Sequence, residues 1–229
     1  MKSKEILSAF EKEVKQNKIS ASYLFYGDKR VDLLFYALEF SKMVMTKDVE
    51  DEEEKKNIEK RIENFQYSDI EVINRKNENI KIDEIRELIY EAIESAYSSP
   101  KKIFILCGIE NLRKESSNAL LKILEEPPKD VYFILLARSL NIISTIKSRT
   151  IKFHLEGESN EELGVSKEIY YFFDGNENNI KQYKKNGILL EKYGDSINSS
   201  EDVLFNIKAM KEYEKNRTEN GENNSDCLL

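Results

Sequence analysis

The chain has 229 residues, 40% of them hydrophobic and 34% charged, and none of its apolar runs approaches the roughly 20 residues that a membrane helix needs. Its formal net charge of −7 argues against a surface built mainly for nucleic acid, and its two cysteines, Cys107 and Cys227, are too few for a disulfide framework or a zinc site. Because charges interrupt the apolar positions of the first residues, no secretory signal is predicted, and we expect a cytoplasmic protein without membrane contact.

The first 64 residues are predicted to form a helix, a strand and two further helices. Apolar side chains at helical spacing predict a helix over residues 6–14, and the apolar run Ser22–Tyr26 is typical of a buried strand that ends at Gly27. Residues 33–44 are too densely apolar for one exposed face, so this helix is expected to pack between a sheet and its neighbours. The charged segment that follows, 46–64, keeps only Ile58 and Ile62 as an apolar stripe, which indicates a solvated helix.

Four more strands are predicted between residues 69 and 154. The expected strands cover residues 69–73, 102–106, 131–136 and 150–154. Asp83 is predicted to be the N-cap of a helix ending near residue 98, and a second helix over 116–126 stops at Pro127 and Pro128. Strands that alternate with helices predict an α/β fold with a parallel five-stranded sheet flanked by helices.

No strand pattern continues after Leu155. Short helices are predicted over residues 168–173, 178–184 and 202–213, which together indicate a small helical domain. The tail 216–229 is rich in Asn, Glu and Gly and is predicted to be disordered, because it has too little apolar surface to offset the entropy of ordering it.

Two segments carry a more specific pattern. Residues Ser116 to Pro128 read SSNALLKILEEPP, and Ser148, Arg149 and Thr150 form a second short motif. Both resemble signatures of the clamp-loader AAA+ family, and the order and spacing of the flanking segments are similar to those of its delta-prime subunits from bacterial DNA polymerase III. The resemblance implies an AAA+-like core over 1–155, a small helical lid-like domain over 156–215, and the tail 216–229.

The nucleotide-binding loop of that family is degenerate in this chain. An active loop reads G-x-x-x-x-G-K-[ST], in which backbone amides and the lysine bind phosphates and the hydroxyl binds magnesium. Here Gly27 is kept, but Asp32 replaces the second glycine, Leu33 the lysine and Leu34 the hydroxyl residue. The loop therefore predicts that the chain binds no nucleotide tightly.

The second half of the nucleotide site is altered as well. Cys107 and Gly108 stand at the end of a strand where an active member has an acidic pair for magnesium and water. We therefore predict a pseudo-ATPase with no cofactor and no metal. The acidic run 50–54 is interpreted as a solvated face, because adjacent like charges repel and do not converge on an ion.

The motif Ser148-Arg149-Thr150 looks like the family's Ser-Arg-Cys motif, whose arginine reaches the nucleotide site of the adjacent subunit. The resemblance implies that Arg149 is an arginine finger acting in trans, a group that can raise the rate of phosphoryl transfer by about 10³ to 10⁵. The alternative is a surface ion pair, the usual fate of an isolated arginine.

The resemblance also implies partners. They are a clamp-loader ATPase of the gamma/tau type and delta-type subunits, with the sliding clamp and primed DNA contacted through the assembled complex. As a holoenzyme subunit in DNA replication, the chain would share the assembly's DNA-directed DNA polymerase classification. No cysteine zinc module is present between residues 43 and 65, and the 75 residues after His154 leave room for the lid and little of the collar domain that relatives carry.

Two other functions stay open at this point. The chain could be a degenerate AAA+ interaction module outside the replisome, since a fold does not determine a function. It could also be an active gamma/tau-type ATPase, although Leu33 and Cys107 would then need substitutes for phosphate binding and metal handling.

Overall fold

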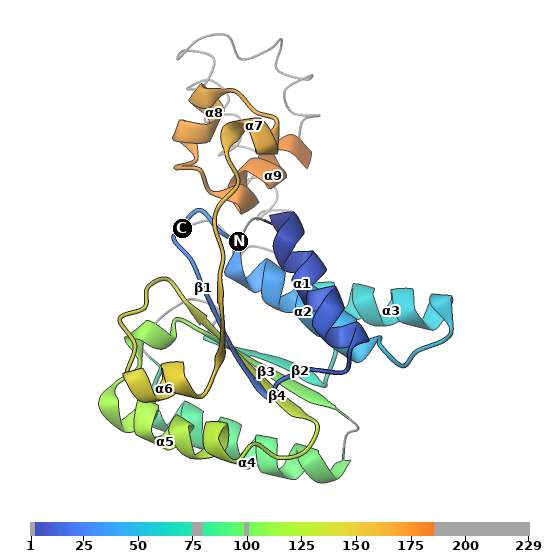
Figure 1. The fold of residues 1–229 in the computed structure, drawn as a ribbon, viewed down its shortest axis with the longest axis vertical. Coiled ribbons are helices and arrows are strands. Elements are labelled where there is room, and N and C mark those ends of the chain that lie inside the picture. Colours follow the sequence, from blue (N-terminus) through green and yellow to red (C-terminus); the bar gives the residue numbers. More distant parts are fainter. Residues whose placement is uncertain (1–2, 75–79, 99–100, 186–229) are drawn as a thin grey trace, which may run out of the picture. The chain divides into compact units, whose positions relative to one another are not determined.

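A computed structural model describes residues 3–74, 80–98 and 101–185. The chain divides into two compact units, Met1–Glu156 and Gly157–Leu229, of which the first contains the sheet (Figure 1). The helix predicted over 202–213 and the tail predicted over 216–229 lie outside the described residues.

The first unit is built on a parallel sheet of five strands. Their order is β2-β3-β4-β1-β5, so that β1 lies between β4 and β5. The strands are β1 (Ser22–Tyr26), β2 (Ile70–Ile73), β3 (Lys102–Cys107), β4 (Val131–Ala137) and β5 (Ile151–His154). The five-stranded parallel sheet is thus confirmed, but the prediction that β5 begins at Thr150 is wrong. The Thr150 hydroxyl donates a hydrogen bond to the Ile146 carbonyl (3.1 Å) and belongs to the preceding turn.

Helices connect the strands. They are α1 (Ser3–Lys15), α2 (Leu33–Met45), α3 (Glu52–Glu63), α4 (Ile82–Ser98), α5 (Lys114–Glu125) and α6 (Ser144–Ser148), together with the 3₁₀ turn η1 (Ile109–Asn111). Asp83 lies in the first turn of α4, so its predicted role as N-cap is wrong. The Lys81 backbone N–H donates to the Glu84 carboxylate (2.7 Å), an interaction typical of a capping box, and the helix therefore begins before Asp83.

Two hydrophobic cores cover the two faces of the sheet, because successive side chains of a strand point to opposite faces. On one face, Phe25 of β1 stacks on Phe10 of α1 with ring centroids 5.0 Å apart, and α2 and α3 complete the layer. On the other face, Phe104 and Phe133 stack at 5.7 Å beneath α4 and α5 (Figure 1). This double-sided burial makes the sheet a rigid support for the loops at its edges.

The charged helix α3 has one buried stripe. Ile58 and Ile62 are buried in the same core as α2, whereas the acidic residues of its first turn are exposed. Asp51 caps the helix by accepting hydrogen bonds from the backbone N–H groups of Glu53 and Glu54. The predicted solvated helix with a thin apolar stripe is confirmed.

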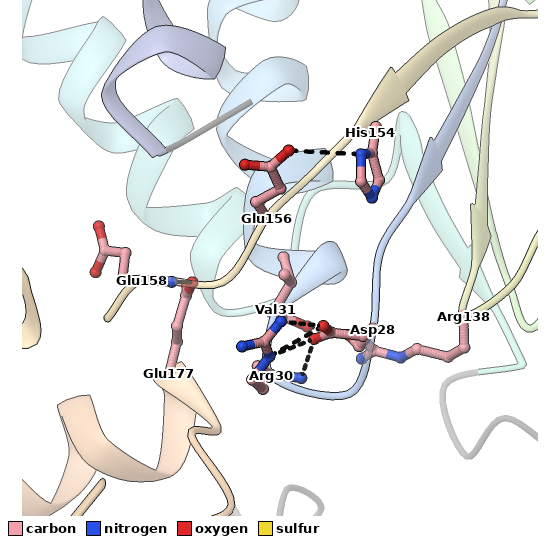
Figure 2. Close-up of polar contacts among 8 residues, drawn as sticks. All are labelled: Asp28, Arg30, Val31, Arg138, His154, Glu156, Glu158 and Glu177. Atoms are coloured by element: carbon pink, nitrogen blue, oxygen red, sulfur yellow. Dashed lines mark hydrogen bonds and ion pairs between the residues drawn. The ribbon is translucent and has the colours of Figure 1, made fainter. Parts of the chain in front are cut away.

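The second unit contains three short described helices, α7 (Asn160–Leu163), α8 (Lys167–Phe172) and α9 (Glu177–Lys185). The sequence predicted α8 and α9 but not α7, a single turn closed by a capping box between Ser159 and Glu162. The Glu177 carboxylate accepts a hydrogen bond from the Glu158 backbone N–H (2.8 Å), and burial raises its pKa (Figure 2). The sequence-based lid assignment of 156–215 stays a prediction.

Neither a membrane-spanning helix nor a metal-binding cluster occurs in the described ranges. No helix within them combines the length and the hydropathy required to span a lipid bilayer. The same ranges contain no group of three or more His, Cys, Asp or Glu side chains arranged to hold a metal ion. Cys107, at the end of β3, is buried.

The edge strand β2 supplies a pH-dependent contribution to stability. Burial, together with the neighbouring Glu91 carboxylate, raises the pKa of Glu71 to about 7. A carboxyl whose pKa is higher in the folded state binds more protons there, so unfolding becomes easier as the pH rises from about 4.5 to about 7. We therefore expect Glu71→Gln to stabilise the protein at pH 8 and to change its stability little at pH 4.5. Urea unfolding at both pH values checks this, and an equal effect at the two would contradict it.

Candidate functional site

The loop between β1 and α2 stands where the family's phosphate-binding loop belongs. Its first residue, Gly27, is held between two other strands: the Gly27 N–H donates to the Ala137 carbonyl (3.2 Å), and the Leu155 N–H donates to the Tyr26 carbonyl (2.8 Å). A Cβ added at Gly27 would lie 2.5 Å from the Leu155 carbonyl oxygen. Residue 27 must therefore be glycine, because the backbone after β5 passes too close to leave room for a side chain.

Asp32 occupies the start of α2 with its own carboxylate. It is the N-cap of the helix, and its Oδ1 accepts a hydrogen bond from the Phe35 backbone N–H (3.0 Å). The free amides of a helix N-terminus are what make it an anion site. Here a negative side chain already uses this end of the helix and would repel a phosphate, which agrees with the degenerate loop read from the sequence.

A pair of arginines closes the loop (Figure 2). Arg30 holds the Asp28 carboxylate through Nε (2.9 and 3.1 Å) and Nη2 (2.5 Å), and these hydrogen bonds lower the pKa of Asp28. Arg138, which follows β4, donates through Nη1 to the carbonyl oxygens of Asp28 (2.8 Å) and Val31 (2.6 Å). The loop is therefore tied by side chains of the protein itself.

The remaining loop positions carry apolar groups. Val31 and Leu33 are buried in the core that lies under α1 and α2, and Leu34 packs against the same core. Leu33 and Leu34 thus have no charge or hydroxyl to offer to a phosphate or to magnesium.

The second altered motif lies at the end of β3. Cys107 is buried, and its carbonyl oxygen accepts a hydrogen bond from Asn74 Nδ2 (2.9 Å). Gly108 adopts a left-handed conformation (φ 70°) that turns the chain into η1. The nearby Glu110 accepts a hydrogen bond from the Arg138 backbone N–H (3.1 Å) through Oε1. This carboxylate therefore helps to position the arginine that binds the β1–α2 loop.

The motif Ser148-Arg149-Thr150 ends the short helix α6. The Ser148 hydroxyl donates to the Thr145 carbonyl (3.0 Å), and the Arg149 backbone N–H donates to the Ile146 carbonyl (3.1 Å). The Arg149 guanidinium forms an ion pair with Glu125 at the end of α5 and donates through Nη1 to the Thr145 carbonyl (2.9 Å) and to Ser148 Oγ (3.4 Å). Its side chain is 31% exposed.

The sheet separates these two groups of residues. Gly27 and Cys107 follow or end strands at the carboxyl edge, whereas Arg149 precedes β5 at the amino edge, where Ile151 pairs with Tyr23 of β1. The four-residue step from Tyr23 to Gly27 corresponds to roughly 13 Å along a strand. Figure 1 shows α6 at the end of the sheet away from the β1–α2 loop. Arg149 is thus placed at the opposite edge from the loop of its own chain.

Sequence reasoning missed three participants. Neither Arg30 nor Arg138 belongs to a recognisable sequence motif, and Glu125 lies inside the segment 116–128 without a signal of its own. The contacts of Arg138 with Asp28 and of Arg149 with Glu125 join residues 110 and 24 positions apart. The one available signal was the lone arginine directly after an apolar strand.

Curated relatives from several bacteria resemble this chain. It is 29% identical over 147 residues to the DNA polymerase III subunit delta prime of Bacillus subtilis, an alignment that covers 63% of this chain and 44% of the relative. With the delta prime subunit of Haemophilus influenzae, it is 35% identical over 98 residues, 42% of this chain and 29% of the relative. The tau/gamma subunit of the same organism is 30% identical over 159 residues, 66% of this chain and 22% of the relative. The chain thus spans less than half the length of these relatives.

A solved structure supports the fold. The gamma subunit-related protein of DNA polymerase III from Thermotoga maritima superposes with a TM-score of 0.52 at 24% identity, covering 72% of this chain and 49% of that one. The predicted AAA+-like α/β class is confirmed. The family described as "DNA polymerase III, delta subunit" matches residues 2–159, more than half of the chain. Together with the delta-prime relatives, this match shows that the chain is a delta-prime-like member of the DNA polymerase III, delta subunit family.

Proposed function

We propose that the chain is a non-catalytic clamp-loader subunit of the delta-prime type. It binds an active ATPase of the gamma/tau type, supplies Arg149 to the nucleotide site of that neighbour, and supports loading of a sliding clamp onto primed DNA during replication. Delta-type subunits complete the complex, and the clamp and DNA are contacted through the assembly. The family match and the delta prime and tau/gamma relatives support this role.

The main support for the proposal is that the loop between β1 and α2 of this chain is closed by its own side chains. Asp32 caps α2, and Asp28, Arg30 and Arg138 tie the loop from inside, while Leu33 and Leu34 offer no phosphate or metal ligand. ATP would have to displace a carboxylate from a helix N-terminus and bring its own negative charge there. The competing proposal of an active gamma/tau-type ATPase therefore has no support from this site.

The second support is the position of Arg149. An arginine at the opposite edge of the sheet from its own loop is suited to a neighbour's nucleotide and not to that loop. In the neighbour's reaction, a water oxygen bonds to the γ-phosphorus while the bond to the β,γ-bridging oxygen breaks. ADP leaves with that electron pair, and the water proton passes to the released phosphate or solvent. Arg149 transfers no proton and stabilises the negative charge that develops.

We also retain the domain scheme as a proposal: an AAA+-like core over 1–155, a lid-like domain over 156–215 and a tail over 216–229. The unit boundary at Glu156 and Gly157 and the helices α7 to α9 support this scheme.

Reconstitution tests the proposed function. The full chain is mixed with a gamma/tau-type ATPase and a delta-type subunit, and the products are separated by size-exclusion chromatography with mass determination. We expect one stable complex whose DNA-stimulated ATP hydrolysis is faster than that of the same mixture without this chain. If no complex forms with the folded chain, the proposed function is wrong and a module outside the replisome is favoured.

A further inference from the structure

We propose that Glu125 is a positioning residue for Arg149: it holds the guanidinium in the orientation in which it meets the neighbour's nucleotide. This inference rests on the proposed function, because it concerns how the arginine finger is presented. Glu125 is the last residue of α5, and Arg149 follows α6, so the ion pair joins two consecutive helices of the core across β4.

The contacts restrain the arginine on three sides. Nη2 pairs with the Glu125 carboxylate, while Nη1 donates to the Thr145 carbonyl (2.9 Å) and to Ser148 Oγ (3.4 Å). A freely rotating arginine side chain loses rotamer entropy when it is fixed in a complex. A guanidinium that is already held in the free chain loses less of this entropy on docking, which is the general advantage of preorganisation.

The restrained guanidinium keeps donors for an incoming anion. Arginine has five N–H donors, and the three contacts occupy both hydrogens of Nη1 and one of Nη2. Within the described part of the chain, no contact occupies the Nε–H or the second Nη2–H, and two donors of one guanidinium can bind two phosphate oxygens together. The side chain is 31% exposed, which is enough to present these donors at the surface.

The support beneath Arg149 is itself rigid. Leu124, next to Glu125, and Ile146, one turn before Thr150, are buried in the same hydrophobic core. Glu125 therefore projects from a packed helix end and can hold the guanidinium against a fixed reference. Because misplacing a reacting group by about 1 Å can lower a rate about 10²-fold, a positioning carboxylate can matter without touching the nucleotide.

The test uses the assembled complex in which the ATPase facing this chain is the only subunit competent for hydrolysis. We expect Glu125→Ala to lower the kcat of that site about tenfold at saturating ATP, with an unchanged KM. Glu125→Gln, which keeps an oxygen acceptor without the charge, should fall between this variant and the wild type. Glu126→Gln is the matched control: its side chain is exposed on the next residue and no ion pair joins it to Arg149 in the described structure.

A double-variant comparison separates positioning from a structural role. In a chain that already carries Arg149→Ala, the change Glu125→Ala should have no further effect on kcat, because there is no finger left to position. A further loss of kcat in the Arg149→Ala background would overturn the inference. Wild-type kcat for Glu125→Ala, with a low kcat for Arg149→Ala, would also overturn it. Both results would leave the proposed function standing. Wild-type kcat for Arg149→Ala itself would instead overturn the proposed function. If Glu125→Ala fails to assemble, the near-isosteric Glu125→Gln decides alone: wild-type kcat overturns the inference.

Discussion

Replacement of Arg149 by alanine is expected to lower the rate of ATP hydrolysis at the neighbouring subunit's site by about 10³-fold while the complex still assembles. The guanidinium is the only group of the motif that carries a charge, and a charge in a water-excluded site between subunits stabilises developing negative charge far more than it could in water. Ser148 and Thr150 bond to carbonyls of α6 and shape its end, so alanine at either position should have smaller effects.

The measurement is single-turnover hydrolysis in the complex whose only competent site faces this chain. Lys147→Ala is the matched control, because Lys147 is a cation two residues earlier, on α6, and its Nζ donates to the Leu140 carbonyl (3.2 Å). Arg149→Lys should recover only part of the rate, since an ammonium cannot reproduce the planar fork of a guanidinium. An equal loss for Lys147→Ala and Arg149→Ala would mean that general positive charge, and not the finger, is responsible.

Replacement of Gly27 by alanine is expected to destabilise the folded protein by about 2 to 3 kcal/mol. The added Cβ would lie 2.5 Å from the Leu155 carbonyl oxygen, a backbone atom at the end of β5 that cannot rotate away. Relief requires β1 and β5 to separate at their carboxyl ends, where the Leu155 N–H bonds to the Tyr26 carbonyl.

Urea unfolding measures this loss, and Gly164→Ala is the comparison. Gly164 has a φ of 63°, and its nearest contact would be the flexible Lys184 Nζ at 3.4 Å, so only backbone strain of about 1 kcal/mol is expected there. Equal losses of stability at the two glycines would show that the close approach of the Leu155 carbonyl oxygen to residue 27 does not cause the destabilisation.

Much of the core could be predicted because its signals are local. Each buried strand is a contiguous apolar run, and the alternation of strands with helices admits few folds. The altered phosphate-binding loop could also be predicted from the sequence. Its motif positions are consecutive, and the residues there, Asp32, Leu33 and Leu34, lack the groups that bind phosphate and magnesium.

What escaped prediction depends on tertiary contacts or on very short elements. The five-residue helix α6 and the four-residue helix α7 are too short for a helical period to be detected. The hydrogen bonds of Arg138 to the loop and the ion pair of Glu125 with Arg149 form only because the folded sheet brings distant residues together. The start of α4 was misplaced because Asp83 looks like an N-cap, whereas the Glu84 carboxylate bonds to the Lys81 backbone.

A delta-prime-type role without ATPase activity requires that the chain's own nucleotide site is closed to ATP. Equilibrium dialysis of the isolated full chain against ATP and magnesium measures this, with an active gamma/tau-type subunit as the positive control. We expect saturable binding to the control and none to this chain at millimolar ATP. Saturable binding to this chain would contradict this expectation, and its loss in Arg30→Ala or Arg138→Ala would show that these arginines are phosphate ligands.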